Sequence, residues 1–269
     1  MDVDEVVRRN DVRFAGPPDG PVVMLAHGFG CDQSLWRFVA GHLAAEYRVV
    51  SFDHVGSGSA DREAWEPSRY STLTGYAEDL LDIVTALDLS DVTFVGHSVA
   101  AIMGVLAANR NPDRFAGLVL VAPSPRYVDD DKGYRGGFSR RDIDELLDSL
   151  ESNYLGWSRT MAPVIMGAPE RPELADELTD SFCRTDPDCA RVFARTTFLS
   201  DNRADLRKVV VPTLVIDCAH DAIAPREVGQ YVREQVPDCR LVTIDTDGHC
   251  PQLSAPEATA QAIEAFLKR

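Results

Sequence analysis

Apolar runs of strand length alternate along this chain with segments whose apolar residues recur every three or four positions. The first pattern is typical of buried strands and the second of helices that bury one face. The helical spacing is clearest at Leu73, Tyr76, Leu80, Ile83, Val84 and Leu87. The apolar runs predict seven strands: Val12–Ala15, Val22–His27, Arg48–Phe52, Val92–Gly96, Gly117–Ala122, Thr213–Cys218 and Leu241–Ile244.

The alternation stops between Ser124 and about Ser200, where no run has the character of a strand. Helical spacing takes its place, and Ser139 with Asp142 resembles the capping box that begins a helix. Several of the predicted strands are apolar on both faces, which favours a mostly parallel sheet covered by helices. We therefore predict an α/β core domain, residues 1–123 and 201–269, with a helical lid inserted at 124–200.

The composition of the chain excludes several classes of function and site. The chain has 269 residues and a formal net charge of −16, which argues against binding to nucleic acid or to an anionic membrane surface. Six cysteines show neither CxxC spacing nor a Cys/His ligand cluster, so we expect no metal site. No stretch resembles a signal peptide or a membrane span, and we expect a cytoplasmic protein with free thiols. Cys250 follows His249, but we interpret it as a packing residue rather than a nucleophile.

One serine stands between a strand-like and a helix-like segment, in TFVGHSVAAIMG at positions 93–104. Strand, glycine, any residue, serine and then a helix of small residues is the pattern of a nucleophile elbow, which lifts the serine hydroxyl above the carboxyl end of a sheet. Gly96 keeps strand and helix close together. Ala100 replaces the second elbow glycine, and as the next smallest residue it still permits the turn. The pattern predicts Ser98 as a nucleophile.

A serine hydroxyl needs a base that takes its proton, and six histidines are available. Hydrolases with this elbow order their residues serine, then aspartate or glutamate, then histidine. His249 follows the last predicted strand in DTDGHCPQ, and loops at the carboxyl ends of strands carry the chemistry of such sheets. His249 is therefore the predicted base. The other histidines are His27, His42, His54, His97 and His220.

The acid that orients the histidine should follow a strand between Ser98 and His249. Asp221 fits, because VPTLVIDCAHDAIAP reads as strand, loop, aspartate and helix. Asp217 is the competitor but lies inside the predicted strand, and Asp129 is a weaker third candidate.

An oxyanion hole needs two backbone N–H groups near the serine. Val99, directly after the nucleophile, should supply one of them. The HGFG turn at positions 27–30 should supply the other, with Phe29 as donor and its ring facing the pocket, because glycines let that backbone turn toward the serine.

With these residues placed, the sequence resembles the α/β-hydrolase superfamily. HGFGCDQSLW, FDHVGSGSAD, GHSV, SPRYVDDD, YRGGF, NYLGW, FLSDNRADL and DGHCPQLSAPE together resemble one subfamily, which holds the RsbQ-type bacterial stress regulators and the plant receptors for strigolactones and karrikins. The similarity runs from Asn10 to the last helix. It implies an α/β-hydrolase fold with a Ser98–Asp221–His249 triad, an oxyanion hole at Phe29 and Val99, and no cofactor.

The resemblance also implies a lid of four helices above an apolar cavity. Met161 falls where the plant receptors tend to carry an aromatic residue, so the shape of the ligand is open. Core packing is as reasonable a role as ligand contact for each lid aromatic. The residues predicted to bind substrate are Phe29, Tyr127, Phe138, Trp157, Met161, Phe198 and Ile223.

Two classes of function follow. The first is a serine esterase or lactonase for a small apolar substrate. The second is a signalling component with slow hydrolysis, and the resemblance implies a PAS-containing PP2C-type phosphatase as its partner. A cofactor-free haloperoxidase or a C–C bond hydrolase would use the same triad. Haloalkane dehalogenases and epoxide hydrolases need a carboxylate where Ser98 stands.

Overall fold

A computed structural model describes residues 2–269, in which seven strands form a single sheet in the order β1-β3-β2-β4-β5-β6-β7. Only β1 is antiparallel to its neighbour, β3, and the other pairs are parallel. The sheet thus has the mostly parallel character that the sequence predicted. Its strands are β1 Arg13–Ala15, β2 Val22–Ala26, β3 Arg48–Phe52, β4 Val92–His97, β5 Phe115–Val121, β6 Thr213–His220 and β7 Cys239–Asp247.

The observed strands extend beyond their predicted ends where polar residues continue the hydrogen bonding to a neighbouring strand. β7 is predicted over Leu241–Ile244 but begins at Cys239 and ends at Asp247, because it stays paired with β6 from Thr213 to His220. Apolar runs mark the buried centre of a strand, whereas hydrogen bonding to a neighbour decides its length. β3 has the predicted bounds.

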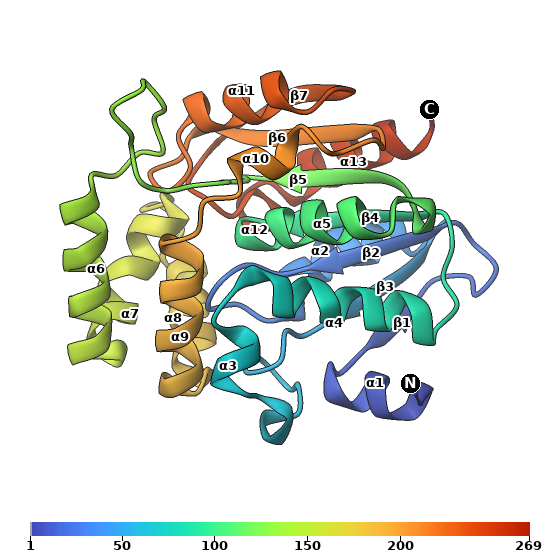
Figure 1. The fold of residues 1–269 in the computed structure, drawn as a ribbon, viewed down its shortest axis with the longest axis horizontal. Coiled ribbons are helices and arrows are strands. Elements are labelled where there is room, and N and C mark those ends of the chain that lie inside the picture. Colours follow the sequence, from blue (N-terminus) through green and yellow to red (C-terminus); the bar gives the residue numbers. More distant parts are fainter. Residues whose placement is uncertain (1) are drawn as a thin grey trace.

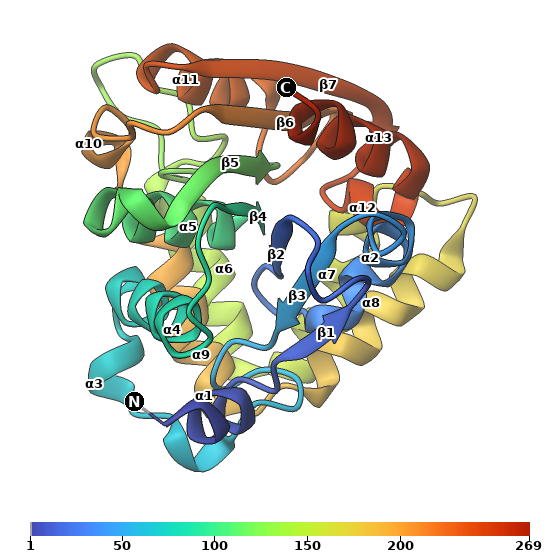
Figure 2. The same ribbon diagram turned by 90° about the vertical axis from the view of Figure 1, so that its right-hand side faces the viewer.

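Helices cover both faces of the sheet, as Figure 2 shows. Met24 and Ala26 of β2 belong to the apolar core beneath α4, α5 and α11, whereas Val23 and Leu25 belong to the core beneath α2 and α13. This alternation is the two-residue period of a strand that is buried on both sides. The core helices are α1 Val3–Arg9, α2 Arg37–Leu43, α3 Pro67–Tyr70, α4 Leu73–Ala86, α5 Val99–Arg110, α10 Arg203–Leu206, α11 Arg226–Gln235, α12 Pro251–Ser254 and α13 Pro256–Leu267, with 3-10 turns at Gln33–Trp36, Arg62–Ala64 and Pro112–Arg114.

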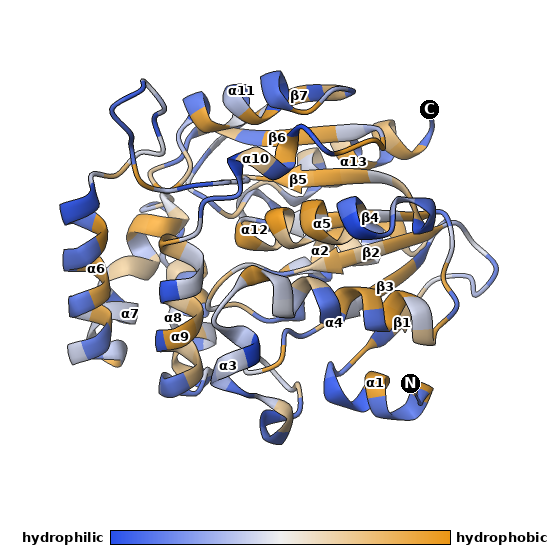
Figure 3. Ribbon diagram, viewed as in Figure 1, coloured by the Kyte–Doolittle hydropathy of each residue, from blue (hydrophilic) through white to orange (hydrophobic). Residues whose placement is uncertain are grey.

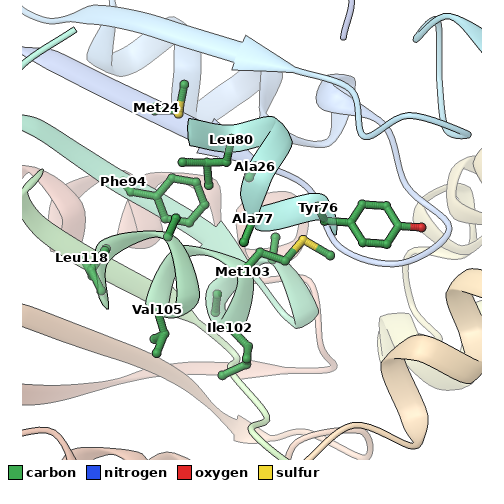
Figure 4. Close-up of a cluster of buried hydrophobic side chains, with 14 of the residues drawn as sticks. Met24, Ala26, Tyr76, Ala77, Leu80, Phe94, Ile102, Met103, Val105 and Leu118 are labelled. Atoms are coloured by element: carbon green, nitrogen blue, oxygen red, sulfur yellow. The ribbon is translucent and has the colours of Figure 1, made fainter. Parts of the chain in front are cut away.

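The larger core cluster holds α4 and α5 against the sheet. Figure 4 shows Leu80 of α4 beside the ring of Phe94 in β4, and Val105 of α5 belongs to the same cluster. All three side chains are at most 1% exposed. Burying such a side chain stabilises the fold by roughly 1.5–3 kcal/mol, so this packing fixes the position at which α5 leaves β4.

Five helices lie between β5 and β6, and the first four of them gather at one end of the sheet (Figure 1). The Ser139–Asp142 capping box begins the first of them, as its spacing predicted. The preceding stretch contains an isolated bridge between Val128 and Phe138. The four helices, which we call the lid, are α6 Arg140–Ser152, α7 Tyr154–Met166, α8 Pro172–Arg184 and α9 Pro187–Phe198.

The lid is amphipathic, with polar outer faces and an apolar side toward the core (Figure 3). Most of its buried apolar residues share one cluster with core residues such as Leu35, Leu253 and Ile223, whereas Phe193 of α9 belongs to the cluster beneath α4 and α5. Two ion pairs also join α8 to the core: Arg37 with Glu177, and Asp32 with Arg184 at 2.7 Å. The lid is therefore packed onto the core by an apolar interface with a charged rim.

Within the described residues, no helix combines the length and the hydropathy needed to cross a membrane. Over the same residues, no group of three or more His, Cys, Asp and Glu side chains is arranged to hold a metal ion. All six cysteines are free, and Cys31, Cys189, Cys218 and Cys250 are buried.

Candidate active site

Ser98 lies at the junction of β4 and α5 in a backbone conformation that L-residues rarely adopt, with φ 56° and ψ −123°. Such a conformation costs on the order of 1–3 kcal/mol and persists only where its surroundings impose it. The Ser98 N–H donates to the Val121 carbonyl at 2.8 Å. A Cβ on Gly96 would lie 2.7 Å from the backbone of Ala100, so no larger residue fits at Gly96. Ala100 itself is fully buried, and the elbow accommodates its methyl group.

The structure brings the three predicted catalytic side chains together. Ser98 Oγ lies 2.8 Å from His249 Nε2, and His249 Nδ1 lies 2.7 Å from Asp221 Oδ2. A carboxylate only accepts hydrogen bonds, so Nδ1 carries the ring proton and Nε2 accepts from the serine hydroxyl. The three residues are 5%, 4% and 8% exposed in the order serine, histidine, aspartate. This arrangement can take a proton from the serine and stabilise the imidazolium that results.

Asp221 is held by the loop that follows β6. Its Oδ1 accepts from the backbone N–H groups of Ile223 at 2.8 Å and Ala224 at 3.1 Å, which leaves Oδ2 for His249. These backbone donors fix the rotamer of the carboxylate. The geometry thus selects Asp221 from the three aspartates that the sequence offered.

The two competing aspartates have other surroundings. Asp217 is within β6 and 2% exposed, and neither of its oxygens accepts a hydrogen bond from a described residue. Asp129 accepts from the backbone of Gly136 and Gly137, so it shapes the loop before the lid. His220 pairs with Asp247 at 2.7 Å on the surface.

The two predicted oxyanion donors belong to segments that adjoin the serine, since Val99 follows Ser98 and Gly28, which precedes Phe29, lies close to Ser98. Val99 is the first residue of α5, whose amino terminus carries partial positive charge. Phe29 follows β2, and its ring packs among Trp157, Phe182, Phe193 and Phe198 at centroid distances of 5.5–6.1 Å. Neither backbone N–H donates a hydrogen bond to another residue in the described chain. Both groups are therefore available to a substrate oxygen.

Tyr127 also contacts the serine, with its hydroxyl 3.3 Å from Ser98 Oγ. Burial raises the pKa of Tyr127 to about 12, so the phenol stays protonated at neutral pH. Because the serine proton is directed to His249, the tyrosine hydroxyl is the donor in this pair. The sequence predicted Tyr127 as a wall of the pocket and gave no signal of this contact.

A small cavity of about 30 Å³ lies above the serine, between core and lid. That volume holds about one water molecule, so a substrate enters only if lid helices or lining side chains move. Six of the seven predicted binding residues line it: Phe29, Tyr127, Trp157, Met161, Phe198 and Ile223. The other lining residues are Cys31, His97, Ser98, Leu146, Ile165, Leu178, Phe182, Thr197, His249 and Cys250.

Comparison with known proteins agrees with the fold and with the type of site described above. The model of the "Alpha/beta hydrolase family" matches residues 22–262. The chain belongs to this family. It is 38% identical over 270 residues to the strigolactone esterase D14 of Arabidopsis thaliana, covering the whole of both chains. It is 37% identical to a karrikin insensitive 2 receptor of Petunia hybrida, over 96% of this chain and 95% of the receptor.

Among solved structures, a hydrolase from Oleispira antarctica superimposes on this family member with a TM-score of 0.96 at 40% identity, covering 100% of this chain and 98% of the other. An enol-lactonase from Burkholderia xenovorans shares the fold, with a TM-score of 0.84 at 21% identity over 96% of each chain. The fold predicted from the sequence is confirmed.

Phe138 is the exception among the predicted binding residues of this α/β hydrolase, because it does not line the cavity. It is half-buried and packs at the edge of the lid cluster, and its N–H donates to the Tyr127 carbonyl at 3.3 Å. Leu178, Phe182 and Thr197 were not predicted. Helical spacing shows which face of a helix is buried, but not whether that face meets another helix or a cavity.

His97, the variable residue of the elbow, has a role that the sequence did not reveal. Its Nε2 donates to the His249 carbonyl at 2.8 Å. Burial and the neighbouring His249 lower its pKa well below 6.5, so the ring is neutral. The lid holds the same loop from above, because the His249 N–H donates to the Ile165 carbonyl at 2.8 Å. The backbone of the catalytic histidine is thus bound to the elbow and to α7.

Proposed function

We propose that this α/β hydrolase is a serine carboxylic ester hydrolase that cleaves a small apolar ester or lactone. The observation that carries the proposal is the buried hydrogen-bonded series Ser98–His249–Asp221, with distances of 2.8 and 2.7 Å, at the bottom of a cavity. An activated serine beside free backbone donors suits acyl transfer.

In the proposed reaction Ser98 Oγ attacks the substrate carbonyl while its proton moves to His249 Nε2. The carbonyl oxygen becomes an anion, bound by the N–H groups of Phe29 and Val99. When this intermediate collapses, the ester C–O bond breaks and His249 donates its proton to the leaving alkoxide. Water then attacks the acyl-serine with His249 as base, which releases a carboxylic acid and restores Ser98. With a lactone, acid and alcohol are parts of one product.

The substrate class follows from the walls of the cavity. Phenylalanine, leucine, isoleucine, methionine and tryptophan side chains line most of it, and it contains no lysine, arginine, aspartate or glutamate in the described chain. Such walls bind neutral apolar groups and disfavour charged ones. The name of the Arabidopsis relative, a strigolactone esterase, supports the same reaction class.

The test is the hydrolysis of p-nitrophenyl acetate by wild-type protein and by Ser98→Ala. We expect turnover by the wild type and a loss of at least about 10³-fold in the variant, since removing a serine nucleophile costs as much as removing a whole triad. Mass spectrometry of the wild type with a slowly hydrolysed lactone should show an acyl adduct on Ser98. Equal rates for the two proteins would refute the proposal.

A second candidate is a ligand sensor in which hydrolysis is slow. Relatives named as receptors and a small cavity of about 30 Å³ favour it, because a ligand that must displace the lid changes the outer surface as it binds. We propose a PAS-containing PP2C-type phosphatase as its partner, on the resemblance to RsbQ-type regulators. A sensor should show a higher Tm with a butenolide ligand and should retain the phosphatase in a pull-down. Rapid multiple turnover with no Tm shift would contradict this candidate.

A further inference from the structure

Two lid residues that line the cavity carry polar atoms without hydrogen-bond partners in the described chain. Trp157 of α7 is 5% exposed and Thr197 of α9 is 1% exposed, and both line the cavity. Neither Trp157 Nε1 nor Thr197 Oγ1 has a hydrogen-bond partner in residues 2–269. A buried polar group left unpaired costs roughly 1–3 kcal/mol, and most such groups in folded proteins are paired.

The Thr197 hydroxyl differs from those of other helical threonines in the lid. Thr160 and Thr179 donate to the carbonyl four residues earlier, at 3.1 and 2.8 Å. The neighbouring Thr196 donates to the Tyr70 carbonyl at 3.0 Å. Each of these hydroxyls is satisfied within the protein, whereas the hydroxyl at the cavity wall is not. This contrast indicates that Thr197 serves something other than the helix.

We propose that Thr197 and Trp157 form a second polar subsite, which binds an uncharged oxygen of the substrate away from the reacting carbonyl. An indole N–H only donates, and a threonine hydroxyl can also donate, so an acceptor satisfies both. Among the described residues, no lysine, arginine, aspartate or glutamate lines the cavity, so the acceptor is an ether, carbonyl or hydroxyl oxygen and not a carboxylate. The inference rests on the proposed function and narrows its substrates to esters or lactones with a second oxygen function.

The position of the two groups supports a separate subsite. The Phe29 ring packs against Trp157 at 6.1 Å and against Phe198, the neighbour of Thr197, at 6.0 Å. Trp157 therefore adjoins the ring of one proposed oxyanion residue, and Thr197 lines the same cavity from α9. When the carbonyl of a substrate lies at Ser98, the part of its acyl or alkyl group that points toward the lid contacts Trp157 and Thr197.

The test uses esters that differ only by a methylene group or an oxygen. The three p-nitrophenyl esters are hexanoate, 3-ethoxypropanoate and 4-methoxybutanoate, which move an ether oxygen along a chain of constant length. The readout is the ratio of kcat/KM for each ether ester to that for hexanoate, compared between wild type and variants. This comparison cancels the intrinsic reactivity of each ester.

We expect Thr197→Val, which keeps the shape and removes the hydroxyl, to lower the ratio for at least one ether ester by about 3- to 10-fold, the value of one neutral hydrogen bond. Thr197→Ser should restore the wild-type ratio, and Trp157→Phe should lower it. Thr196→Val is the matched control, because it removes the adjacent hydroxyl that bonds Tyr70. It should leave the ratio unchanged.

Equal ratios in wild type and Thr197→Val for both ether esters would overturn the subsite. If Thr197→Val does not fold, the ratio in Trp157→Phe decides in its place, and a wild-type ratio there would overturn the subsite as well. Hexanoate hydrolysis that is absent in wild type, or equal in Ser98→Ala, would instead refute the proposed function. The two failures are therefore distinguishable.

Discussion

The two walls of the cavity, which we call the floor and the roof, differ in how completely their polar atoms are hydrogen-bonded. The floor, formed by Ser98, Asp221 and His249 on core loops, has hydrogen bonds of 2.7–3.1 Å along its whole length. The roof, formed by the lid residues that line the cavity, is mostly apolar, and two of its polar atoms have no partner. The hydrogen bonds of the floor are formed before a substrate binds, whereas the unpaired polar atoms of the roof gain a partner only from a bound substrate.

This difference follows from what each part is built on. The floor lies at the carboxyl ends of parallel strands, which hold their loops in place through the sheet register. The roof consists of helices packed by an apolar cluster, where side chains of similar volume exchange at little cost. Chemistry should therefore depend on the floor residues, and selectivity on the roof residues.

The largest expected effect comes from the floor. Asp221→Asn should lower kcat for p-nitrophenyl acetate by about 10⁴-fold, as the same change does in a serine protease triad, because the amide no longer holds the correct histidine tautomer. Asp217→Asn, four residues earlier, is the matched control and should keep kcat near the wild-type value. A small loss in Asp221→Asn would mean that the floor is not preorganised as described.

Tyr127 links roof and floor, since its hydroxyl contacts Ser98 at 3.3 Å. Tyr127→Phe should lower kcat/KM by roughly 2- to 10-fold, the range for one neutral hydrogen bond. Because burial raises the tyrosine pKa to about 12, the ratio of wild-type to variant rates should be constant from pH 6 to 9. A ratio that changes across this interval would show that the phenol acts as a titrating group and not as a fixed donor.

The same division explains what the sequence could predict. The elbow serine follows from a glycine next to a predicted strand. The acid and the base follow from their positions after predicted strands and from their order along the chain. All of these signals can be read from the sequence without knowing how the helices pack. Thr197 and Phe182 could not be found in this way, because their relation to the cavity depends on how four helices pack. The prediction that Phe138 binds substrate was wrong for the same reason. The YRGGF motif around it is specific, but its half-buried ring lies at the edge of the lid cluster.

Asp217 is a buried carboxylate within β6, and neither of its oxygens has a hydrogen-bond partner in the described chain. Burial, and to a lesser extent the charge of Asp221, raises its pKa. The folded protein therefore holds a proton more tightly than the unfolded chain. The contribution of this group to stability is full below the unfolded pKa of about 3.9 and is lost as pH rises through the folded value.

Asp217→Asn removes this dependence. The Tm of the variant relative to wild type should rise between pH 4 and pH 8, by roughly 2–4 °C for each kcal/mol recovered. Thermal melts in a series of buffers at constant ionic strength measure the difference. Parallel curves for the two proteins would show that Asp217 is ionised to the same extent in both states.

The smallest effect concerns the attachment of the roof to the floor. Arg37 of α2 binds Glu177 of α8 through two contacts, at 2.5 and 2.8 Å, and both side chains are more than a third exposed. An exposed pair contributes about 0–1 kcal/mol, so Glu177→Gln should lower Tm only slightly, and less at 1 M salt, where charges are screened. Glu170→Gln is the control, because Glu170 pairs with the adjacent Arg171 and joins no core residue.

The Arg37–Glu177 pair also bears on how the small cavity admits a substrate. If the lid moves away from the core, Glu177→Gln should speed the labelling of Ser98 by a serine-reactive phosphonate at low salt, and the gain should vanish at 1 M salt. If only lining side chains move, the labelling rates of Glu177→Gln, Glu170→Gln and wild type should agree at both salt concentrations. The first result would make the roof a moving part above a fixed floor, and the second would make it a rigid cover with mobile side chains.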